Sequence, residues 1–326
     1  MMAPILYLVV PCYNEEAALL YTVDILKEKL FELMDSDKVS KLSRIMFIND
    51  GSKDSTWEII EKASQGVNGF VVGGVNLIKN VGHQNALLAG LTESVKHADI
   101  MISIDADLQQ DISAIDEMID RYNAGNDVVY GVRNDRGTDG VMKKITALSF
   151  YKIMKMMGCN IITNHADYRL MSKRAVSCLA EYEETNMFLR GMVPELGLPS
   201  SEVYFNVKER EYGESKYTLK KMIKLASDGI TSFSTSPLHF IFLLGIFTLL
   251  VSVIMIITTV VAYFKGNVVS GWSTLMCSMY FLGGEMLMAL GVVGEYCGKM
   301  YLETKHRPRY HVDKVLLDEG NEVVDR

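Results

Sequence analysis

One stretch near the C-terminal end constrains the fold more than any other feature of the chain. Residues Leu238–Phe264 read LHFIFLLGIFTLLVSVIMIITTVVAYF and contain no Lys, Arg, Asp or Glu. As a helix this run would extend about 40 Å, which is enough to cross a hydrocarbon core of about 30 Å. Buried helices of soluble domains are rarely apolar over so long a run. The sequence therefore predicts a transmembrane helix.

A second apolar run, Gly271–Gly294, predicts a second span and contains a single charge, Glu285. The linker Lys265–Ser270 is short, so the two spans would form a hairpin. Lysines and arginines gather before the first span and after the second, which places both ends on the cytoplasmic side. A charge inside a span is a functional candidate, and the alternative for Glu285 is that it pairs between helices or between subunits. The flanking cations are Lys216, Lys220, Lys221 and Lys224 on one side and Lys299, Lys305, Arg307 and Arg309 on the other.

Strand-like apolar runs alternate with helical patterns over the first half of the chain. The pattern predicts a mainly parallel sheet with helices on both faces. Expected strands are Ile5–Val10, Arg44–Ile48, Asn76–Ile78, Ile100–Ile104 and Asp127–Tyr130. Expected helices lie near Glu15–Met34, Ser55–Ala63, Gln84–Val95 and Ile112–Asn123. The first strand runs straight into Pro11 and is too short for a signal peptide.

Charge and cysteine content narrow the class of protein. The formal net charge is −7, which argues against a nucleic-acid binder. An anionic ligand would therefore need local cations, a metal or backbone amides. The five cysteines form no C-x-x-C pair, so they are expected to be reduced thiols on the cytosolic side of the membrane.

A polar cluster follows each expected strand. In α/β sheets ligands bind beyond the carboxyl ends of the strands, so these clusters should form one site. No G-x-G-x-x-G follows the first strand and no P-loop motif occurs, which weakens a dinucleotide or P-loop interpretation. In chain order the clusters are PCYNEE, NDGSKDST, KNVGHQNA, DADLQQD and GVRNDR.

The cluster DADLQQD places Asp105 and Asp107 two residues apart. Side chains at this spacing on an extended segment point the same way, and two carboxylates suit a hard divalent cation that also binds substrate phosphates. The alternative is an acidic loop in which Asp111 caps the next helix. In NDGSKDST, Ser55 and Glu58 fit a capping box, whereas Asp50 could accept hydrogen bonds from a ribose or a base.

Later clusters leave alternatives open. Arg133 and Arg136 supply cations near the sheet edge, or else belong to a solvated loop. Asp167 and Arg169 could be functional or could form a surface ion pair. The basic segment that precedes the first span predicts an amphipathic helix on the bilayer surface, with a purely topological role of its lysines as the alternative.

Taken together, the clusters resemble the family-2 glycosyltransferases with a GT-A fold, a Rossmann-like nucleotide-sugar-binding domain. They look most like the polyprenyl-phosphate glycosyltransferases, which include bactoprenol glucosyltransferases and dolichol-phosphate mannose synthases. The two C-terminal spans are similar to the bactoprenol branch. The matching segments are VPCYNEE, NDGSKDST, KNVGHQNALLAGL, DADLQ, GVRNDR, ADYRLMSK, REYGESKY and GEYCGKMYLETKHRPRY, which cover nearly the whole chain.

The resemblance implies roles for individual residues. It assigns the catalytic base to Asp167, with positioning of the acceptor or the sugar as the alternative, because a phosphate acceptor is already largely ionised at neutral pH. Nucleotide-sugar binding is implied for Pro11, Tyr13, Glu15, Asp50, Asn80, Asp105, Ala106 and Asp107. Binding of Mg²⁺ or Mn²⁺ is implied for Asp105, Asp107 and Gln109. Binding of the lipid phosphate is implied for Arg133, Arg210, Ser215, Lys216 and Tyr217.

Two positions depart from the family pattern. Asn49 stands where the family often has the first aspartate of Asp-Asp-Gly-Ser, so a charge is missing beside the nucleotide. Gln110 and Asp111 follow DADLQ where the family often has proline, which puts the conformation of that loop in question.

The resemblance implies inverting transfer of one sugar from a UDP-sugar to undecaprenyl phosphate at the cytoplasmic membrane face. The product would be a lipid-linked sugar donor for cell-envelope glycosylation. Glucose is the first expectation, with N-acetylglucosamine or galactose as alternatives, and a homo-oligomer, a tetramer, is implied. The expected parts are a cytoplasmic GT-A domain (1–215), a juxtamembrane amphipathic helix (216–236), a multi-pass transmembrane hairpin in the bilayer (237–296) and a cytoplasmic tail (297–326).

Two other functions fit the sequence less well. A processive polysaccharide synthase usually carries Q-x-x-R-W, and neither tryptophan, Trp57 or Trp272, ends that motif. A catalytically inactive scaffold would not need the carboxylates and the arginine that the chain retains at Asp105, Asp107, Asp167 and Arg210.

Overall fold

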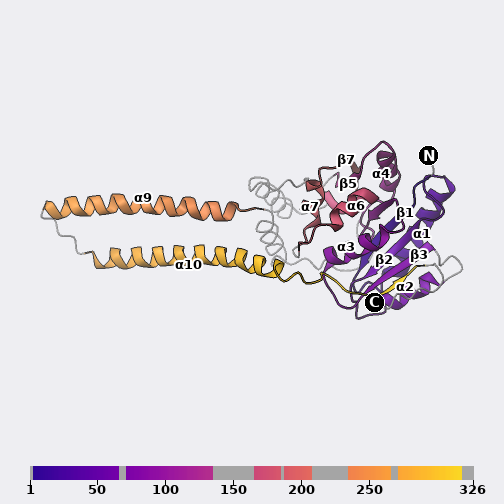
Figure 1. The fold of residues 1–326 in the computed structure, drawn as a ribbon, viewed down its shortest axis with the longest axis horizontal. Helices are drawn as coiled ribbons and strands as arrows, with labels where there is room; N and C mark the ends of the chain where they lie inside the picture. Colours follow the sequence, from indigo (N-terminus) through magenta and orange to yellow (C-terminus); the bar gives the residue numbers. More distant parts are fainter. Residues whose placement is uncertain are drawn as a thin grey trace. The chain divides into compact units, whose positions relative to one another are not determined.

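The computed structural model describes residues 3–65, 71–134, 165–184, 187–207, 234–265 and 271–317. The chain divides into two compact units, and Figure 1 labels the elements of both. One unit contains Met1–Lys152, Asn160–Thr218 and Arg307–Arg326, and the other contains Ile153–Cys159 and Leu219–His306.

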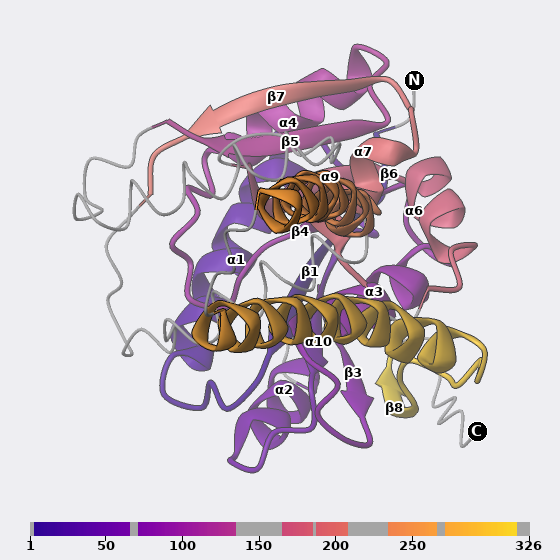
Figure 2. The same ribbon diagram turned by 90° about the vertical axis from the view of Figure 1, so that its left-hand side faces the viewer.

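The first unit is built on an eight-stranded sheet with the order β7-β5-β6-β4-β1-β2-β3-β8. Strand β1 pairs in parallel with β2 and β4, β2 pairs in parallel with β3, and β5 pairs in parallel with β7. Strand β6 runs antiparallel to β4 and β5, and β8 runs antiparallel to β3. Figure 2 shows β8 beside β3. The strands are β1 Leu6–Cys12, β2 Arg44–Asn49, β3 Val72–Leu77, β4 Ile100–Ser103, β5 Val128–Arg133, β6 His165–Ser172, β7 Ser200–Phe205 and β8 Val312–Leu316.

The α/β prediction is confirmed for the first five strands, each of which overlaps its expected range. The antiparallel strands β6 and β8 were not expected and make the sheet mixed. Both strands pair only antiparallel with their neighbours, so neither belongs to the parallel βαβ units whose pattern revealed the other strands.

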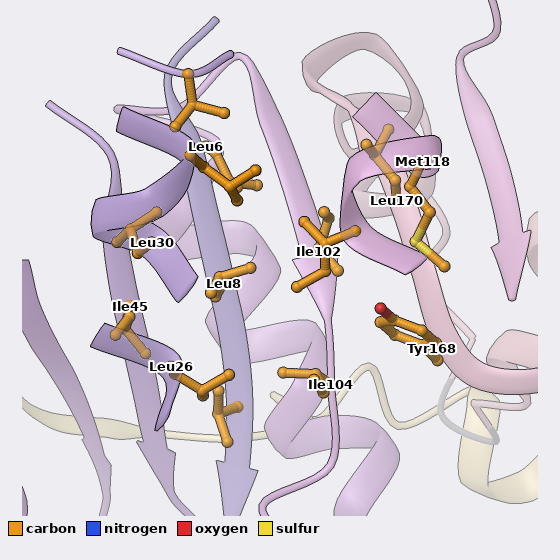
Figure 3. Close-up of a cluster of buried hydrophobic side chains, with 14 of the residues drawn as sticks. Leu6, Leu8, Leu26, Leu30, Ile45, Ile102, Ile104, Met118, Tyr168 and Leu170 are labelled. Carbon is orange, nitrogen blue, oxygen red and sulfur yellow. The ribbon is translucent and has the colours of Figure 1, made fainter. Parts of the chain in front are cut away.

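Helices cover both faces of the sheet, as predicted. On one face Leu6 and Leu8 of β1 are fully buried in a cluster that includes Leu26 and Leu30 of α1 (Figure 3). On the other face Gly90 of α3 approaches the sheet so closely that an added Cβ would lie 2.4 Å from Ile48 and 2.7 Å from Val9. The helices of this unit are α1 Leu19–Asp35, α2 Thr56–Ser64, α3 His83–Ser94, α4 Ala114–Asn123, α6 Lys173–Ala180 and α7 Leu189–Glu195.

The helix starts differ from the sequence prediction at α1 and α2. Helix α1 begins at Leu19 because Glu15 first closes a turn, its carbonyl accepting the N–H groups of Ala18 and Leu19. The capping box expected at Ser55 is wrong, since that side chain makes no capping hydrogen bond. Asp54 takes the role instead, its Oδ1 accepting the backbone N–H of Thr56 at 3.1 Å.

As the capping alternative suggested, Asp111 accepts a backbone N–H at the start of α4. It lies shortly before the first residue of the helix. Asp111 Oδ1 accepts the backbone N–H of Ser113 at 3.1 Å. The helix then begins at Ala114.

The second unit contains the two long helices α9 Ser236–Phe264 and α10 Trp272–Glu303. Within the described ranges, one helix is long and apolar enough to cross a membrane, over Ser236–Ala262 with a mean hydropathy of 3.0. The second span stays a prediction. Thr248 Oγ1 donates to Glu285 Oε1 at 3.4 Å, so Glu285 has the interhelical contact that the alternative described. Most of the predicted juxtamembrane helix lies outside the described residues.

Candidate active site

The antiparallel strand β6 brings two predicted site residues together. Because β6 runs against β4, it begins at the edge of the sheet where β4 ends. Ser103 of β4 is paired with Arg169 of β6, and the same register continued places Asp105 opposite Asp167. Ser103 Oγ also donates a short hydrogen bond to the carbonyl of Asp167. The predicted metal ligand and the predicted base are therefore neighbours across two strands.

His83 links these two carboxylates. It is the first residue of α3, and its Nε2 lies 3.7 Å from Asp105 Oδ1 and 3.8 Å from Asp167 Oδ2. The two carboxylate oxygens are thus no further apart than the sum of those distances. The imidazole is 43% exposed, so a ligand at this edge can reach it. The cluster KNVGHQNA signalled this position, although the sequence did not assign a role to His83.

Asp167 lies in a buried cluster of charges. Its side chain is 9% exposed, and Oδ1 accepts from Arg169 Nη2 at 2.6 Å. Arg190 donates from Nη2 to Oδ2 at 2.9 Å and from Nε to both oxygens at 3.2 Å. Burial by itself raises the pKa of the Asp167 carboxyl, but the two guanidinium charges outweigh it and hold the pKa well below its ordinary value. The surface ion pair considered for Asp167 and Arg169 is therefore wrong, because Arg169 is only 1% exposed.

Arg190 reaches this cluster from α7, which two other elements hold in place. The backbone N–H of Leu189 donates to Gln84 Oε1 at 2.7 Å, and Arg169 Nη1 donates to the Leu189 carbonyl at 3.1 Å. The start of α3 and the strand β6 thus fix the first turn of α7. The Arg190 side chain is 31% exposed, so it joins the buried carboxylate to the surface.

The loop that carries Asp105 and Asp107 is held by Gln110. The Gln110 side chain is almost fully buried, its Nε2 donates to Asp105 Oδ2 and its Oε1 accepts the Asp105 backbone N–H at 3.3 Å. Asp105 Oδ1 is left on the side of His83. The loop turns through Leu108, whose φ of 47° is unusual for a branched residue, and Asp107 Oδ1 accepts the Gln109 N–H at 3.2 Å. Gln110, a departure from the family pattern, is therefore an integral part of this loop.

The donor set at this loop fits a divalent ion shared with a substrate. Among the described residues, no group of three or more His, Cys, Asp or Glu side chains is arranged to hold a metal ion by itself. Mg²⁺ commonly takes one or two carboxylates and completes its shell with phosphate oxygens and water. Asp105 and Asp107 can supply those carboxylates. Gln109 touches Asp107 through its backbone N–H.

The predicted nucleotide residues Asp50 and Asn80 contact each other. Asp50 Oδ1 accepts the Val81 N–H at 2.7 Å, while Oδ2 accepts the Gly82 N–H and Asn80 Nδ2, both at 3.0 Å. Burial raises the pKa of the Asp50 carboxyl, and these hydrogen bonds offset the effect only in part. Gly51, with φ of 62°, is required next to it because an added Cβ would lie 2.5 Å from the Asn80 nitrogen.

The β1–α1 loop lies beside the β2–α2 loop and is tied to it. The Glu15 N–H donates to Thr56 Oγ1 at 3.0 Å, and the Asn14 N–H donates to Ser52 Oγ at 3.0 Å. Tyr13, which precedes Asn14 in the β1–α1 loop, is 38% exposed.

Two further predicted residues have structural contacts. Pro11 is buried in β1 opposite Ile48. Ala106 is 6% exposed, and its carbonyl accepts Thr22 Oγ1 at 2.7 Å.

Of the residues predicted to bind the acceptor, Arg133 lies within the described ranges. Arg133 ends β5, two strands from β4 in the sheet, and its backbone is paired with Phe205 of β7. Because β5 is antiparallel to β6, which is antiparallel to β4, its end lies at the same edge as Asp105. The other residues predicted here lie outside the described ranges: Arg136, Arg210, Ser215, Lys216 and Tyr217.

Comparison with known proteins gives consistent matches. Residues 7–180 match the family described as glycosyl transferase family 2. A Bacillus subtilis (strain 168) protein called uncharacterized glycosyltransferase YkoT is 45% identical over 97% of this chain and 93% of its own length. The bactoprenol glucosyl transferase of Shigella phage SfX is 40% identical over 93% of this chain and 97% of its own. A prophage bactoprenol glucosyl transferase homolog of Escherichia coli (strain K12) is 39% identical over 94% and 98%.

The family match spans β1 to α6 and so includes every strand end that contributes to the site. The mixed sheet with helices on both faces is the GT-A-like fold that the resemblance implied. The matched domain, the relatives and the fold agree on one conclusion: the chain is a glycosyltransferase and belongs to glycosyl transferase family 2.

Proposed function

We propose that this enzyme transfers one glucose from UDP-glucose to undecaprenyl phosphate at the cytoplasmic face of the membrane, with inversion at the anomeric carbon. The observation that carries the proposal is the juxtaposition of Asp105 and Asp167 around His83 at the carboxyl edge of the sheet. The lipid acceptor and the sugar are inferred from relatives named bactoprenol glucosyl transferases, which match over nearly the whole chain.

The donor half of the site would be formed by the loops after β1, β2 and β4. Tyr13, Pro11 and Glu15 would lie along the nucleotide, with the Asp50–Asn80 pair shaping the wall behind it. Asp105 and Asp107 would hold Mg²⁺ or Mn²⁺, which when bound neutralises charge on the departing diphosphate.

The surroundings of Asp167 argue against its use as a proton acceptor. Two arginines stabilise its ionised form, so the carboxylate is a very weak base. A phosphate monoester has a second pKa near about 6 and is largely ionised at neutral pH, so the acceptor oxygen can attack without a base. We therefore assign Asp167 to the positioning of Arg169 and Arg190, and not to proton transfer.

Arg190 is the cation of this cluster that a ligand can reach. A guanidinium matches a phosphate with two parallel hydrogen bonds, and the carboxylate behind Arg190 fixes the direction in which it points. We propose that Arg190 contacts phosphate oxygens during transfer, and that His83 lies against the transferred sugar. Arg133, Arg210, Ser215, Lys216 and Tyr217 remain proposed contacts of the lipid phosphate.

The membrane part would keep the acceptor near the site. We propose that α9 and α10 both span the bilayer. The N-terminal end of α9 and the C-terminal end of α10 would face the cytoplasm, and residues 216–236 would lie on the membrane surface. The boundaries 1–215 and 237–296 and a tetrameric assembly belong to the same proposal. The expected tail, 297–326, contributes β8 to the sheet, so the glycosyltransferase domain is not confined to residues 1–215.

The test is a transfer assay with the purified full-length enzyme. Undecaprenyl phosphate is incubated separately with UDP-glucose, UDP-N-acetylglucosamine and UDP-galactose, each with Mg²⁺, Mn²⁺ or a chelator, and the lipid is analysed by mass spectrometry. The expected product carries one hexose, forms from UDP-glucose and needs the metal.

Asp105→Asn is the matched inactive control for this assay. A lipid that carries several sugars would support a processive synthase instead. Absence of any lipid product and of UDP release with all three donors would overturn the proposed reaction.

A further inference from the structure

Strand β8, which follows the two long helices in the chain, contains a bulge opposite β3. Asn76 is paired with Lys314 and Leu77 with Val312, so Asp313 is an extra residue between them. A bulge re-aims the side chain that it carries. Here it lets Asp313 Oδ2 accept a hydrogen bond from Asn76 Nδ2 at 2.9 Å, while Lys314 Nζ binds Glu61 of α2 at 2.7 Å.

This contact sets the orientation of the Asn76 amide. An ionised carboxylate can only accept hydrogen bonds, so the NH₂ group of Asn76 must face Asp313. Its Oδ1 then faces β2, where it accepts from Asn49 Nδ2 at 2.7 Å. The residue at position 49 must therefore be a donor. An aspartate at this position, which is the residue the family pattern favours, would place two acceptors in contact.

The network continues to the loops of the proposed nucleotide site. Asn49 Oδ1 accepts the Ser52 N–H at 3.2 Å, and Ser52 Oγ accepts the Asn14 N–H at 3.0 Å. Asn14 Oδ1 in turn accepts the Lys53 N–H at 2.9 Å. Asn14 adopts a left-handed conformation, with φ of 53°, so the neighbouring backbone depends on these bonds. Asn49 is 3% exposed, which makes an unmatched polar contact there costly.

We propose that Asp313 is a positioning residue for the nucleotide-sugar site. It fixes the direction of the Asn76 and Asn49 amides, and through Ser52 it holds the β1–α1 and β2–α2 loops against each other. The C-terminal strand β8 thus helps to organise a site that otherwise comes from the N-terminal half of the chain. The nucleotide part of this inference rests on the proposed function.

The test is a set of variants that reverses the hydrogen bonds along the network. Asn49→Asp alone should weaken UDP-glucose binding about tenfold and lower the Tm, because two acceptors then meet at Asn76. Asp313→Asn alone should have less than about a twofold effect, since an amide at 313 can accept as the carboxylate does. The double variant should restore binding to within about threefold of wild type, because Asn76 can turn over and donate to the carboxylate introduced at position 49.

A matched control keeps the net charge of the double variant without touching the network. Asn49→Asp is combined with Asp24→Asn, a change at an exposed residue of α1, and this pair should behave like Asn49→Asp alone. UDP-glucose affinity is measured by calorimetry, and the Tm is measured without nucleotide, all on the full-length protein.

The outcomes test two statements separately: that Asp313 orients the hydrogen-bond network, and that this network positions the nucleotide site. If Asp313→Asn restores the Tm and the UDP-glucose affinity of Asn49→Asp no better than Asp24→Asn does, the proposed network is wrong. If the double variant regains the Tm but not the UDP-glucose affinity, Asp313 has no positioning role at the nucleotide site. A wild-type protein that fails to bind UDP-glucose refutes the proposed donor, while the Tm comparison still decides whether Asp313 orients Asn76 and Asn49.

Discussion

Two buried aspartates at the same edge of the sheet are stabilised in opposite ways. Asp50 is 3% exposed and Asp167 is 8% exposed, so both have lost most of their water. The partners of Asp50 are neutral backbone and amide N–H groups, and its pKa is raised. The partners of Asp167 are two arginines, and its pKa is lowered. Neutral donors fix the direction of a carboxylate, whereas cations also compensate its charge.

This difference separates two kinds of role. Asp50 joins the loop after β2 to the loop after β3, so its effect on a ligand would pass through the shape of those loops. Asp167 compensates one fully buried and one partly exposed guanidinium, so its effect would pass through charge. A substitution that keeps the shape of the side chain but removes its charge should therefore reduce activity strongly at Asp167.

The largest effect is expected for Asp167→Asn. The variant leaves the buried Arg169 without its compensating charge, a loss that costs about 3–5 kcal/mol where buried pairs are broken, and it releases Arg190 from its fixed direction. Because Arg190 would lose the geometry in which it contacts phosphate, transfer of sugar to the lipid should fall by roughly 10³-fold, which corresponds to about 4 kcal/mol of activation free energy. The measurement is the initial rate of lipid product, with Asp24→Asn as the control at an exposed aspartate. Transfer at a rate close to wild type would contradict an essential role of Asp167.

Arg190 should tolerate replacement less well than its partly exposed position suggests. Arg190→Gln removes the charge that reaches the surface, and we expect transfer to fall by roughly 100-fold. Arg190→Lys keeps the charge but cannot bind two oxygens side by side, so a loss of roughly tenfold is expected. Steady-state kinetics with varied undecaprenyl phosphate would measure both, with Arg121→Gln on α4 as the control. Equal rates for the glutamine and lysine variants would show that charge at position 190 is irrelevant.

The sequence predicted the part of the site that follows parallel strands. Asp50, Asp105 and Asp107 lie within a few residues of the end of an apolar run, and the carboxyl ends of such strands meet at one edge of a sheet. The residues alone left Asp167 as either a functional residue or part of a surface ion pair, and only the family resemblance gave it a role. It lies near the start of β6 and reaches the same edge because β6 is antiparallel. Arg190 follows no strand at all. Its place depends on the contacts of Gln84 and Arg169 with Leu189, which no local pattern can reveal.

The two departures from the family pattern show a second limit of sequence interpretation. From sequence alone, Asn49 and Gln110 are substitutions that put a contact in doubt, yet each is hydrogen-bonded within the structure. The partner of Gln110 lies five residues away, and a tight turn could have suggested it. The partner that explains Asn49 is Asn76, whose amide is oriented by Asp313 more than two hundred residues later in the chain. Local sequence contains no trace of that contact.

A smaller effect is expected from Gln110→Ala. The variant frees Asp105 to rotate without removing its charge, so Mn²⁺ binding in the presence of UDP should weaken by roughly fivefold, or about 1 kcal/mol, the net contribution of a typical hydrogen bond. A Mn²⁺ titration followed by electron paramagnetic resonance measures this, with Gln65→Ala as the control at an exposed glutamine. Unchanged Mn²⁺ affinity would mean that Asp105 keeps its position without Gln110.

The smallest effect, and the most direct test of the comparison, is the dependence of stability on pH. The pKa of Asp167 is lower in the folded than in the unfolded state, so its contribution is present above about pH 4 and is lost as the pH falls below that value. The pKa of Asp50 is raised, so its contribution is present below about pH 4 and is lost as the pH rises through the folded-state pKa.

Thermal unfolding of the full-length protein between about pH 3 and pH 7 should therefore separate the two aspartates. Relative to wild type, Asp167→Asn should become less stable as the pH rises toward about 5. In the folded wild type Asp167 stays ionised over this range, whereas in the unfolded wild type its carboxyl loses a proton as the pH rises, so only the wild type gains stability. Asp50→Asn should become relatively more stable over the same rise, because only the wild type must ionise a buried carboxyl whose hydrogen-bond partners are neutral. If both variants differ from wild type by an amount that does not change with pH, the two carboxyls titrate alike in the folded and unfolded states, and the contrast between amide and arginine partners has no thermodynamic consequence.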